Sequence, residues 1–187
     1  MIANSVRMTL SWGLQVLLLS AVLGGTLVPG KLHAQDGVGF TDLDPNQPVI
    51  DHTGSSLTPE QIGELESQVA ALTDTGAEVV LLVRDLDATP VETLDQVEDL
   101  QQAWVAEAGS DQDVTIAVLI NRNPDDPRDV RAGIYVGRTY NDGNIPEDEQ
   151  VSIVEDVLIP PLRNGDVYAS FSNTLARIQD DILYSPP

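Results

Sequence analysis

The sequence predicts an α/β fold: a three-layer α/β/α sandwich in which a small mixed β-sheet is flanked by helices. Two observations predict it. Continuous apolar runs of strand length alternate with segments whose apolar residues recur at helical spacing behind capped starts. In addition, a short connection rich in Pro and Asp joins two of the apolar runs, so those two strands are expected to be antiparallel while the others are parallel.

The first 34 residues differ in composition from the rest and predict a signal peptide. Arg7 precedes an apolar run over residues 14–23, and a small residue, Ala34, marks the expected cleavage site. An uncleaved anchor is the alternative, because residues 10–28 are nearly long enough to span a bilayer. No later segment is long and apolar enough to cross a membrane, so the mature chain is expected to be exported and to lack an integral span.

The chain is strongly acidic, with 30 acidic and nine basic side chains and a net charge of −21. Every acidic residue follows residue 35, and the only lysine, Lys31, lies in the predicted leader. Such a body repels nucleic acid and anionic lipid and attracts cations, although solubility alone would also explain the charge. Because the chain has no cysteine, disulfides, thiol nucleophiles and cysteine metal sites are excluded.

Residues 35–48 are rich in Asp, Gly and Pro and predict a flexible lead-in, which leaves residues 49–184 for the folded domain. The first helix is expected to start after Thr58, with Thr58 as N-cap, Pro59 at the first helical position and Gln61 as the capping-box partner. Four apolar residues at helical spacing follow, and Gly76 is expected to end the helix. Residues 77–86 form an apolar run that predicts a strand covered on both faces.

The second helix repeats the pattern of the first, with Thr89 as N-cap and Glu92 as its capping-box partner. Gly109 closes it, and residues 114–122 predict a second strand parallel to the first. Its core-facing stripe is expected to comprise Leu94, Val97, Gln101, Trp104 and Ala108.

The Asn-Pro and Asp-Pro pairs in residues 123–127 predict a turn. Residues 130–137 are therefore expected to form a strand antiparallel to the preceding one, and residues 138–149 a loop. A third helix is expected from about Pro146, with Pro160 and Pro161 making it kink or stop near Ile159. Gly165 and Asp166 then predict a turn and the cap of a fourth helix. The core faces of these two helices are expected to carry Val151, Val154 and Leu158, then Phe171, Leu175, Ile178 and Ile182.

The antiparallel strand gathers acidic loops at one edge of the sheet, since the loop after it lies beside the loop before its neighbour. Hard cations such as Ca²⁺ or Mg²⁺ take carboxylate, carbonyl and water oxygens. A divalent cation site is therefore expected there, with Asp111, Asp113, Asp142, Glu147 and Asp148 as metal ligands. As the alternative, Glu147 and Asp148 merely favour the start of a helix through its dipole, and the other acids are solvated surface.

A second acidic pattern, Asp85-x-Asp87-x-Thr89 after an apolar strand, has the form of a phosphatase nucleophile motif that works with magnesium. The competing interpretation is that Thr89 is simply a helix cap. His52 is expected to be non-catalytic and Asp51 to cap a turn, because no other hydrolase motif accompanies them. Arg131 and Arg138 flank the third strand and are expected to pair with nearby acids, with contact to an anion as the alternative.

Several stretches, in order, resemble the TPM domain family, named after a plant thylakoid-lumen acid phosphatase, a photosystem II repair protein and a modulator of acetylcholine receptors. They are "VIDHTGSSLTPEQIGELE", "GAEVVLLV", "GSDQDVTIAVLI", "VRAGIYVG" and "EDVLIPPLRNGDVYASF". The family's Gly-Tyr-Gly turn is replaced here by Tyr135-Val136-Gly137. The resemblance implies the α/β/α sandwich, a bound calcium or similar ion, and acid phosphatase activity as the enzymatic alternative.

Together these features predict an exported accessory protein of the periplasm or a thylakoid lumen. It is expected to bind a divalent cation and to act as a monomer on a membrane protein complex, in maintenance or repair such as that of photosystem II. A weak metal-dependent acid phosphatase and an interaction domain without any ligand are the two alternatives.

Overall fold

The computed structural model describes residues 40, 43–126 and 128–184. Within them, four strands form one mixed sheet in the order β1-β2-β3-β4. β1, β2 and β3 are parallel, and β4 pairs antiparallel with β3. The mixed sheet is therefore as predicted. The strands are β1 Val49–Asp51, β2 Glu78–Asp85, β3 Thr115–Arg122 and β4 Val130–Val136.

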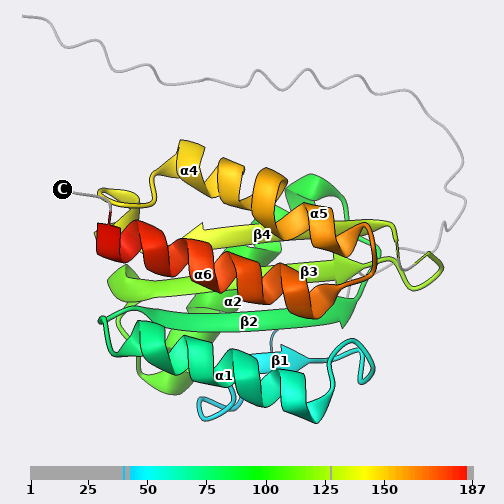
Figure 1. The fold of residues 1–187 in the computed structure, drawn as a ribbon, viewed down its shortest axis with the longest axis horizontal. Coiled ribbons are helices and arrows are strands. Elements are labelled where there is room, and N and C mark those ends of the chain that lie inside the picture. The colour runs from blue at the N-terminus through cyan, green and yellow to red at the C-terminus, as the bar shows by residue number, and fades with distance from the viewer. Residues whose placement is uncertain (1–39, 41–42, 127, 185–187) are drawn as a thin grey trace, which may run out of the picture. The chain divides into compact units, whose positions relative to one another are not determined.

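Helices cover both faces of this sheet, which confirms the three-layer sandwich (Figure 1). α1, α6 and the run from α4 to α5 lie on one face, and α2 lies on the other. The helices are α1 Pro59–Thr73, α2 Pro90–Ala108, the 3-10 turn η1 Gln112–Val114, α3 Arg138–Asn141, α4 Glu147–Ser152, the π-helical η2 Ile153–Leu158, α5 Ile159–Leu162 and α6 Val167–Tyr184.

Two apolar clusters lie on opposite faces of the sheet because alternate side chains of β2 and β3 point to opposite sides. Leu81 and Val118 belong to the larger cluster, beneath α1 and α6, while Leu82 and Leu119 pack against α2. All four side chains are fully buried, as the continuous apolar runs predict. The segment expected to be a flexible lead-in also contributes, since Leu43 is buried in the α2-side cluster.

The three predicted helix caps are present. Asp166 accepts the N–H of Ala169 at 2.9 Å at the start of α6. Thr58 and Thr89 each accept a hydrogen bond from the backbone N–H three residues on, and each helix has its capping box. The end of α1 differs from the expectation: Asp74 is its C-cap, and Gly76, at φ 96°, serves the turn into β2. The sequence pattern also missed β1 and the short helix α3, because three or four residues are too few to show a period.

The third helix does not stop at Ile159, which was one of the two outcomes expected there. It continues from α4 through η2 into α5 and ends at Leu162. Pro160 and Pro161 lie at the start of α5, directly after the π-helical segment. In a regular α-helix each proline ring crowds the carbonyl four residues before it. Here these carbonyls belong to the wider π-helical segment η2. Within this helix Ile153 is fully buried and Val151 is 51% exposed.

Ser170 of α6 secures the end of the π-helical segment, because its hydroxyl donates a 2.5 Å hydrogen bond to the carbonyl of Leu158. Both residues are fully buried. Ser170→Ala is expected to lower the free energy of unfolding by about 1–2 kcal/mol in urea denaturation, since it removes a buried hydrogen bond. Ser67→Ala, at an exposed hydroxyl that bonds its own helix, is the control and should be near neutral. Equal losses in the two variants would contradict this role of Ser170.

Candidate functional site

The start of β3 and the end of β4 bring η1 and α3 side by side, as the antiparallel pairing predicts. The N–H of Gly137 donates to the carbonyl of Thr115 at 2.9 Å. A Cβ atom at Gly137 would lie 2.5 Å from the carbonyl oxygen of Asp113 and 2.6 Å from that of Gln112. Glycine is therefore required here for close backbone approach, which fixes where α3 begins relative to η1.

Of the five predicted ligands, Asp113 contacts the guanidinium of Arg138 at this edge, and Asp111 and Asp142 act on the same guanidinium through their charges. Asp113 Oδ2 accepts a 2.7 Å hydrogen bond from Arg138 Nη2. That hydrogen bond and the charge of Asp113, together with the charges of Asp142 and Asp111, raise the pKa of Arg138 above its ordinary value. The expected pairing of Arg138 with nearby acids is confirmed. Because the Arg138 side chain is 71% exposed, it can leave this position at little cost.

Asp111 also has a local role, since its Oδ1 accepts the N–H of Asp113 at 3.0 Å and so caps η1. We define the acidic edge as Asp111, Asp113, Asp142 and the central Arg138.

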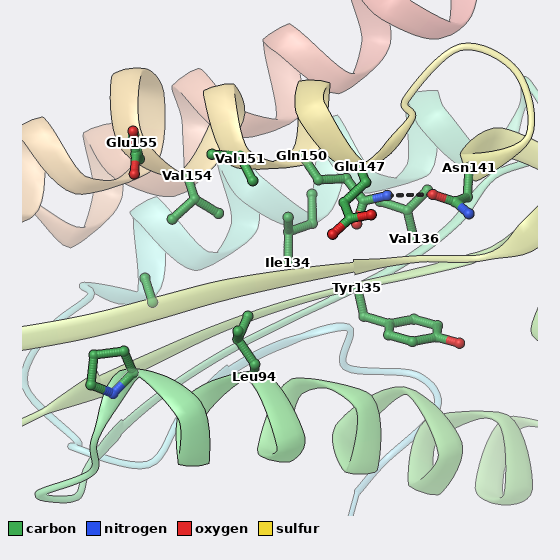
Figure 2. A pocket seen from close by; sticks show the side chains of 12 residues that line it. Leu94, Ile134, Tyr135, Val136, Asn141, Glu147, Gln150, Val151, Val154 and Glu155 are labelled. Carbon is green, nitrogen blue, oxygen red and sulfur yellow. Dashed lines mark hydrogen bonds between the residues drawn. The ribbon is translucent and has the colours of Figure 1, made fainter. Parts of the chain in front are cut away.

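The other two predicted ligands lie in the first turn of α4, where acidic residues stabilise a helix start. Glu147 lines a hollow along β4 beside Gln150, whose amide donates to Asn141 at 2.7 Å (Figure 2). Asp148 is exposed. In the described part of the chain, no three acidic or histidine side chains are arranged to hold a metal ion.

Asp51 organises the loop between β1 and α1, as the turn-capping interpretation predicts. Its carboxylate accepts hydrogen bonds from the N–H groups of Thr53, Gly54, Ser56 and Leu57 and from the Thr53 hydroxyl, at 2.6–3.1 Å. Burial alone would raise the pKa of Asp51, but the hydrogen bonds from Thr53, Leu57 and Ser56 outweigh it and lower the pKa. Its neighbour His52 is exposed.

The phosphatase-like pattern divides into two structural roles. Asp85 Oδ1 accepts hydrogen bonds from Arg122 Nε and Nη2 at 2.9 and 2.7 Å. Thr89 caps α2, as its competing interpretation predicts.

Arg84 is a buried cation that the pattern did not single out, although an arginine inside an apolar strand was a visible signal. Its Nε donates to Asn121 at 2.8 Å and its Nη2 to Gln96 at 2.9 Å. The ring of Phe40 lies 4.6 Å from its guanidinium carbon. Burial lowers the pKa of Arg84.

A hollow of about 730 Å³ runs along β4, between the start of α2 and the α4–η2 helix (Figure 2). Leu94 of α2 and Val151 of α4 line it and are 57% and 51% exposed. Both were expected to face the core. Periodicity identified them as apolar-face residues, but it carries no information on where the sheet ends.

Comparison with known proteins identifies the domain. A family model described as the TPM domain matches residues 49–181. The chain belongs to the TPM domain family. This confirms the resemblance drawn from its motifs, and the match begins at β1.

Two solved structures resemble this TPM domain. The N-terminal domain of a protein from P. gingivalis has a TM-score of 0.56 at 18% identity, covering 74% of this chain and 83% of that one. The N-terminal domain of the cg2496 protein from Corynebacterium glutamicum has a TM-score of 0.51 at 13% identity, covering 86% and 89%. At these identities the likeness shows a shared fold only. No curated protein matches the chain.

Proposed function

We propose that this TPM domain binds a divalent cation, calcium in the first place, at its acidic edge. The observation that supports this is the position of the Arg138 guanidinium, which donates a 2.7 Å hydrogen bond to Asp113 at the edge where Asp111 and Asp142 add their negative charges, so a cation is favoured at that point. A divalent ion carries twice that charge and takes oxygen ligands from carboxylates, carbonyls and water.

Arg138 would compete with the ion for the same carboxylates. Its guanidinium is largely exposed and its ion pair with Asp113 lies at the surface, where such pairs contribute little stability. Displacing it into solvent therefore costs little, and Asp113 is then released as a ligand. Glu147 and Asp148, which begin α4 nearby in the chain, are proposed to add negative charge and outer ligands rather than the central contacts.

Thermal melts in calcium and in EDTA test the site. Calcium that binds only the folded protein raises the melting temperature, and a concentration 100 times the dissociation constant adds about 2.7 kcal/mol. We expect the double variant Asp111→Asn/Asp113→Asn to lose this shift. Its control, Asp95→Asn/Asp99→Asn, removes the same charge from exposed positions of α2 and should keep the shift.

Arg138→Gln distinguishes a specific site from general attraction to an acidic protein. Removing the competing guanidinium is expected to tighten calcium binding by roughly two- to fivefold, the range set by a surface ion pair of up to about 1 kcal/mol. Isothermal titration calorimetry of the variant and the wild type measures this ratio. Unchanged or weaker binding in Arg138→Gln, or no calcium shift in the wild type, would overturn the cation site.

We further propose that the domain acts after export, in the periplasm or a thylakoid lumen, as an accessory to a membrane protein complex such as photosystem II. The supports are the leader-like composition of residues 1–34 and the family resemblance, which implies such a role. None of the helices in the described residues is long and apolar enough to span a membrane. Fractionation of cells that express the full chain, with detection of the processed N-terminus, tests the location.

A further inference from the structure

The outer edge of β4 carries backbone groups that no strand pairs. The bonds from Gly137 N–H to Thr115 O and from Asn123 N–H to Asp129 O fix the antiparallel pattern between β3 and β4. In that pattern alternate residues direct both backbone groups toward the partner, and the residues between them direct both groups away. The N–H and C=O of Val130, Ala132, Ile134 and Val136 therefore point away from β3.

These outward groups remain available for a further strand. Arg131 Nη1 donates to the Val130 carbonyl at 2.9 Å. Within residues 40, 43–126 and 128–184, the outward groups of Ala132, Ile134 and Val136 have no hydrogen-bond partner. All three residues line the hollow of about 730 Å³ beside β4. An open row of this kind is a template for strand addition.

The walls of the hollow are apolar on both sides. Leu94 of α2 lines one side of the hollow, and Val151 and Val154 of the α4–η2 helix line the other, with Ile134 between the two sides (Figure 2). Leu94 and Val151 are more than half exposed although each lies on the apolar stripe of its helix. A fifth strand in this position would be covered on both faces and would bury both side chains, so its own sequence should be a continuous apolar run.

The two ends of the groove carry different charged groups. Near Val130 the hollow continues into a second one of about 690 Å³, whose lining includes three arginines and three acids: Arg128, Arg131, Arg163, Asp129, Glu155 and Asp156. Asp129 is paired with Arg131. In the described residues neither Arg128 nor Arg163 forms an ion pair, whereas Arg122, Arg131, Arg138 and Arg177 all do. Glu147 lies in the part of the groove near Val136.

We propose that this groove binds an extended apolar peptide segment of another protein as a fifth strand antiparallel to β4. In that direction the C-terminal end of the segment reaches Arg128 and Arg163, which take up its carboxylate, and a basic N-terminal residue reaches Glu147. A second copy of this chain is the poorer occupant, because two bodies that each carry a net charge of about −21 repel one another.

This docking role goes beyond cation binding and uses residues outside the acidic edge. Its probe is a synthetic octapeptide, Lys-Lys-Val-Thr-Val-Ile-Val-Ala, with a free C-terminus or an amidated one. Binding is followed by fluorescence anisotropy, and amide hydrogen exchange identifies where it occurs. We expect protection of the Ala132, Ile134 and Val136 N–H groups, because these would donate to the peptide.

Matched variants distinguish specific binding in the groove from nonspecific hydrophobic association. Leu94→Glu should weaken binding by at least roughly tenfold, since it puts a charge on an apolar wall. Val91→Glu is the control: Val91 is 68% exposed on the same helix but does not line the groove, so the change should be under about twofold. Amidation should weaken binding to the wild type by roughly fivefold, but not to Arg128→Gln/Arg163→Gln, which lacks the carboxylate partners.

Three results would overturn this role. The first is no binding of the peptide at millimolar concentration. The second is that the peptide protects amides other than those of β4 and that Leu94→Glu and Val91→Glu weaken its binding equally. The third is concentration-dependent self-association that Leu94→Glu abolishes, measured by sedimentation, because it would make a second copy the occupant.

Discussion

Gly137→Ala is expected to lower the free energy of unfolding by about 3 kcal/mol, the upper end of the cost of overpacking a site that cannot relax. The new methyl group would meet the carbonyl oxygens of Asp113 and Gln112 at 2.5 and 2.6 Å. Both are backbone atoms of η1, so no side-chain rotation relieves the clash. The backbone at Gly137 has φ −59°, so the loss comes from contact and not from an unfavourable conformation. Urea denaturation measures it.

Gly63→Ala is the matched control for this variant. Gly63 lies in α1, and a Cβ there meets nothing within 4 Å. The same chemical change should therefore stabilise the protein by about 0.5–1 kcal/mol, because alanine favours a helix interior more than glycine. A neutral Gly137→Ala would contradict the close approach of η1 and β4. If Gly137→Ala lowered only the affinity for calcium and not the stability, the substitution would act through Arg138 and not through the contact with η1.

Asp51→Ala is expected to lower the free energy of unfolding by about 3 kcal/mol. The substitution removes the charged carboxylate that accepts the hydrogen bonds of the loop N–H groups. Five hydrogen bonds converge on that one side chain and hold the β1–α1 loop against the start of α1. Asp44→Ala is the control, because Asp44 accepts bonds only within an exposed turn. Its denaturation midpoint should not change.

The contribution of Asp51 has a defined pH dependence. The folded protein lowers its pKa, so the stabilisation is fully present above the unfolded value of about 3.9 and is lost as pH falls through the folded value. The difference in unfolding free energy between wild type and Asp51→Ala should therefore be constant near neutral pH and shrink below about pH 4. A difference that grew in acid would show that the carboxylate is not the acceptor.

The sequence predicted best what local chemistry determines. Thr58 and Thr89 carry their capping boxes within four residues, so both helix starts were found, and the antiparallel β4 followed from a short turn. The π-helical η2 was missed because it depends on tertiary contacts with α6, such as the hydrogen bond from Ser170 to the carbonyl of Leu158. β1 was missed because its three residues are too few to show a period and are held as a strand by pairing with β2.

The candidate sites divide in the same way. Strand direction alone placed Asp111, Asp113 and Asp142 at one edge of the sheet. The position of Arg138 beside them depends on side-chain conformation, which strand direction does not predict. Leu94 and Val151 were correctly identified as apolar-face residues. Their exposure follows from the sheet ending at β4, a long-range fact that no single segment of the sequence contains.

The stacking of Phe40 on Arg84 bears on where this domain begins. The family match starts at Val49, yet the aromatic ring that covers the buried guanidinium and the Leu43 side chain that fills the α2-side cluster both lie upstream of it. The folding unit is thus longer than the homologous unit. A fragment cut at the family boundary would uncover one face of the Arg84 guanidinium, which donates hydrogen bonds to the neutral amides of Asn121 and Gln96. The short segment before β1 is therefore a structural part of the domain.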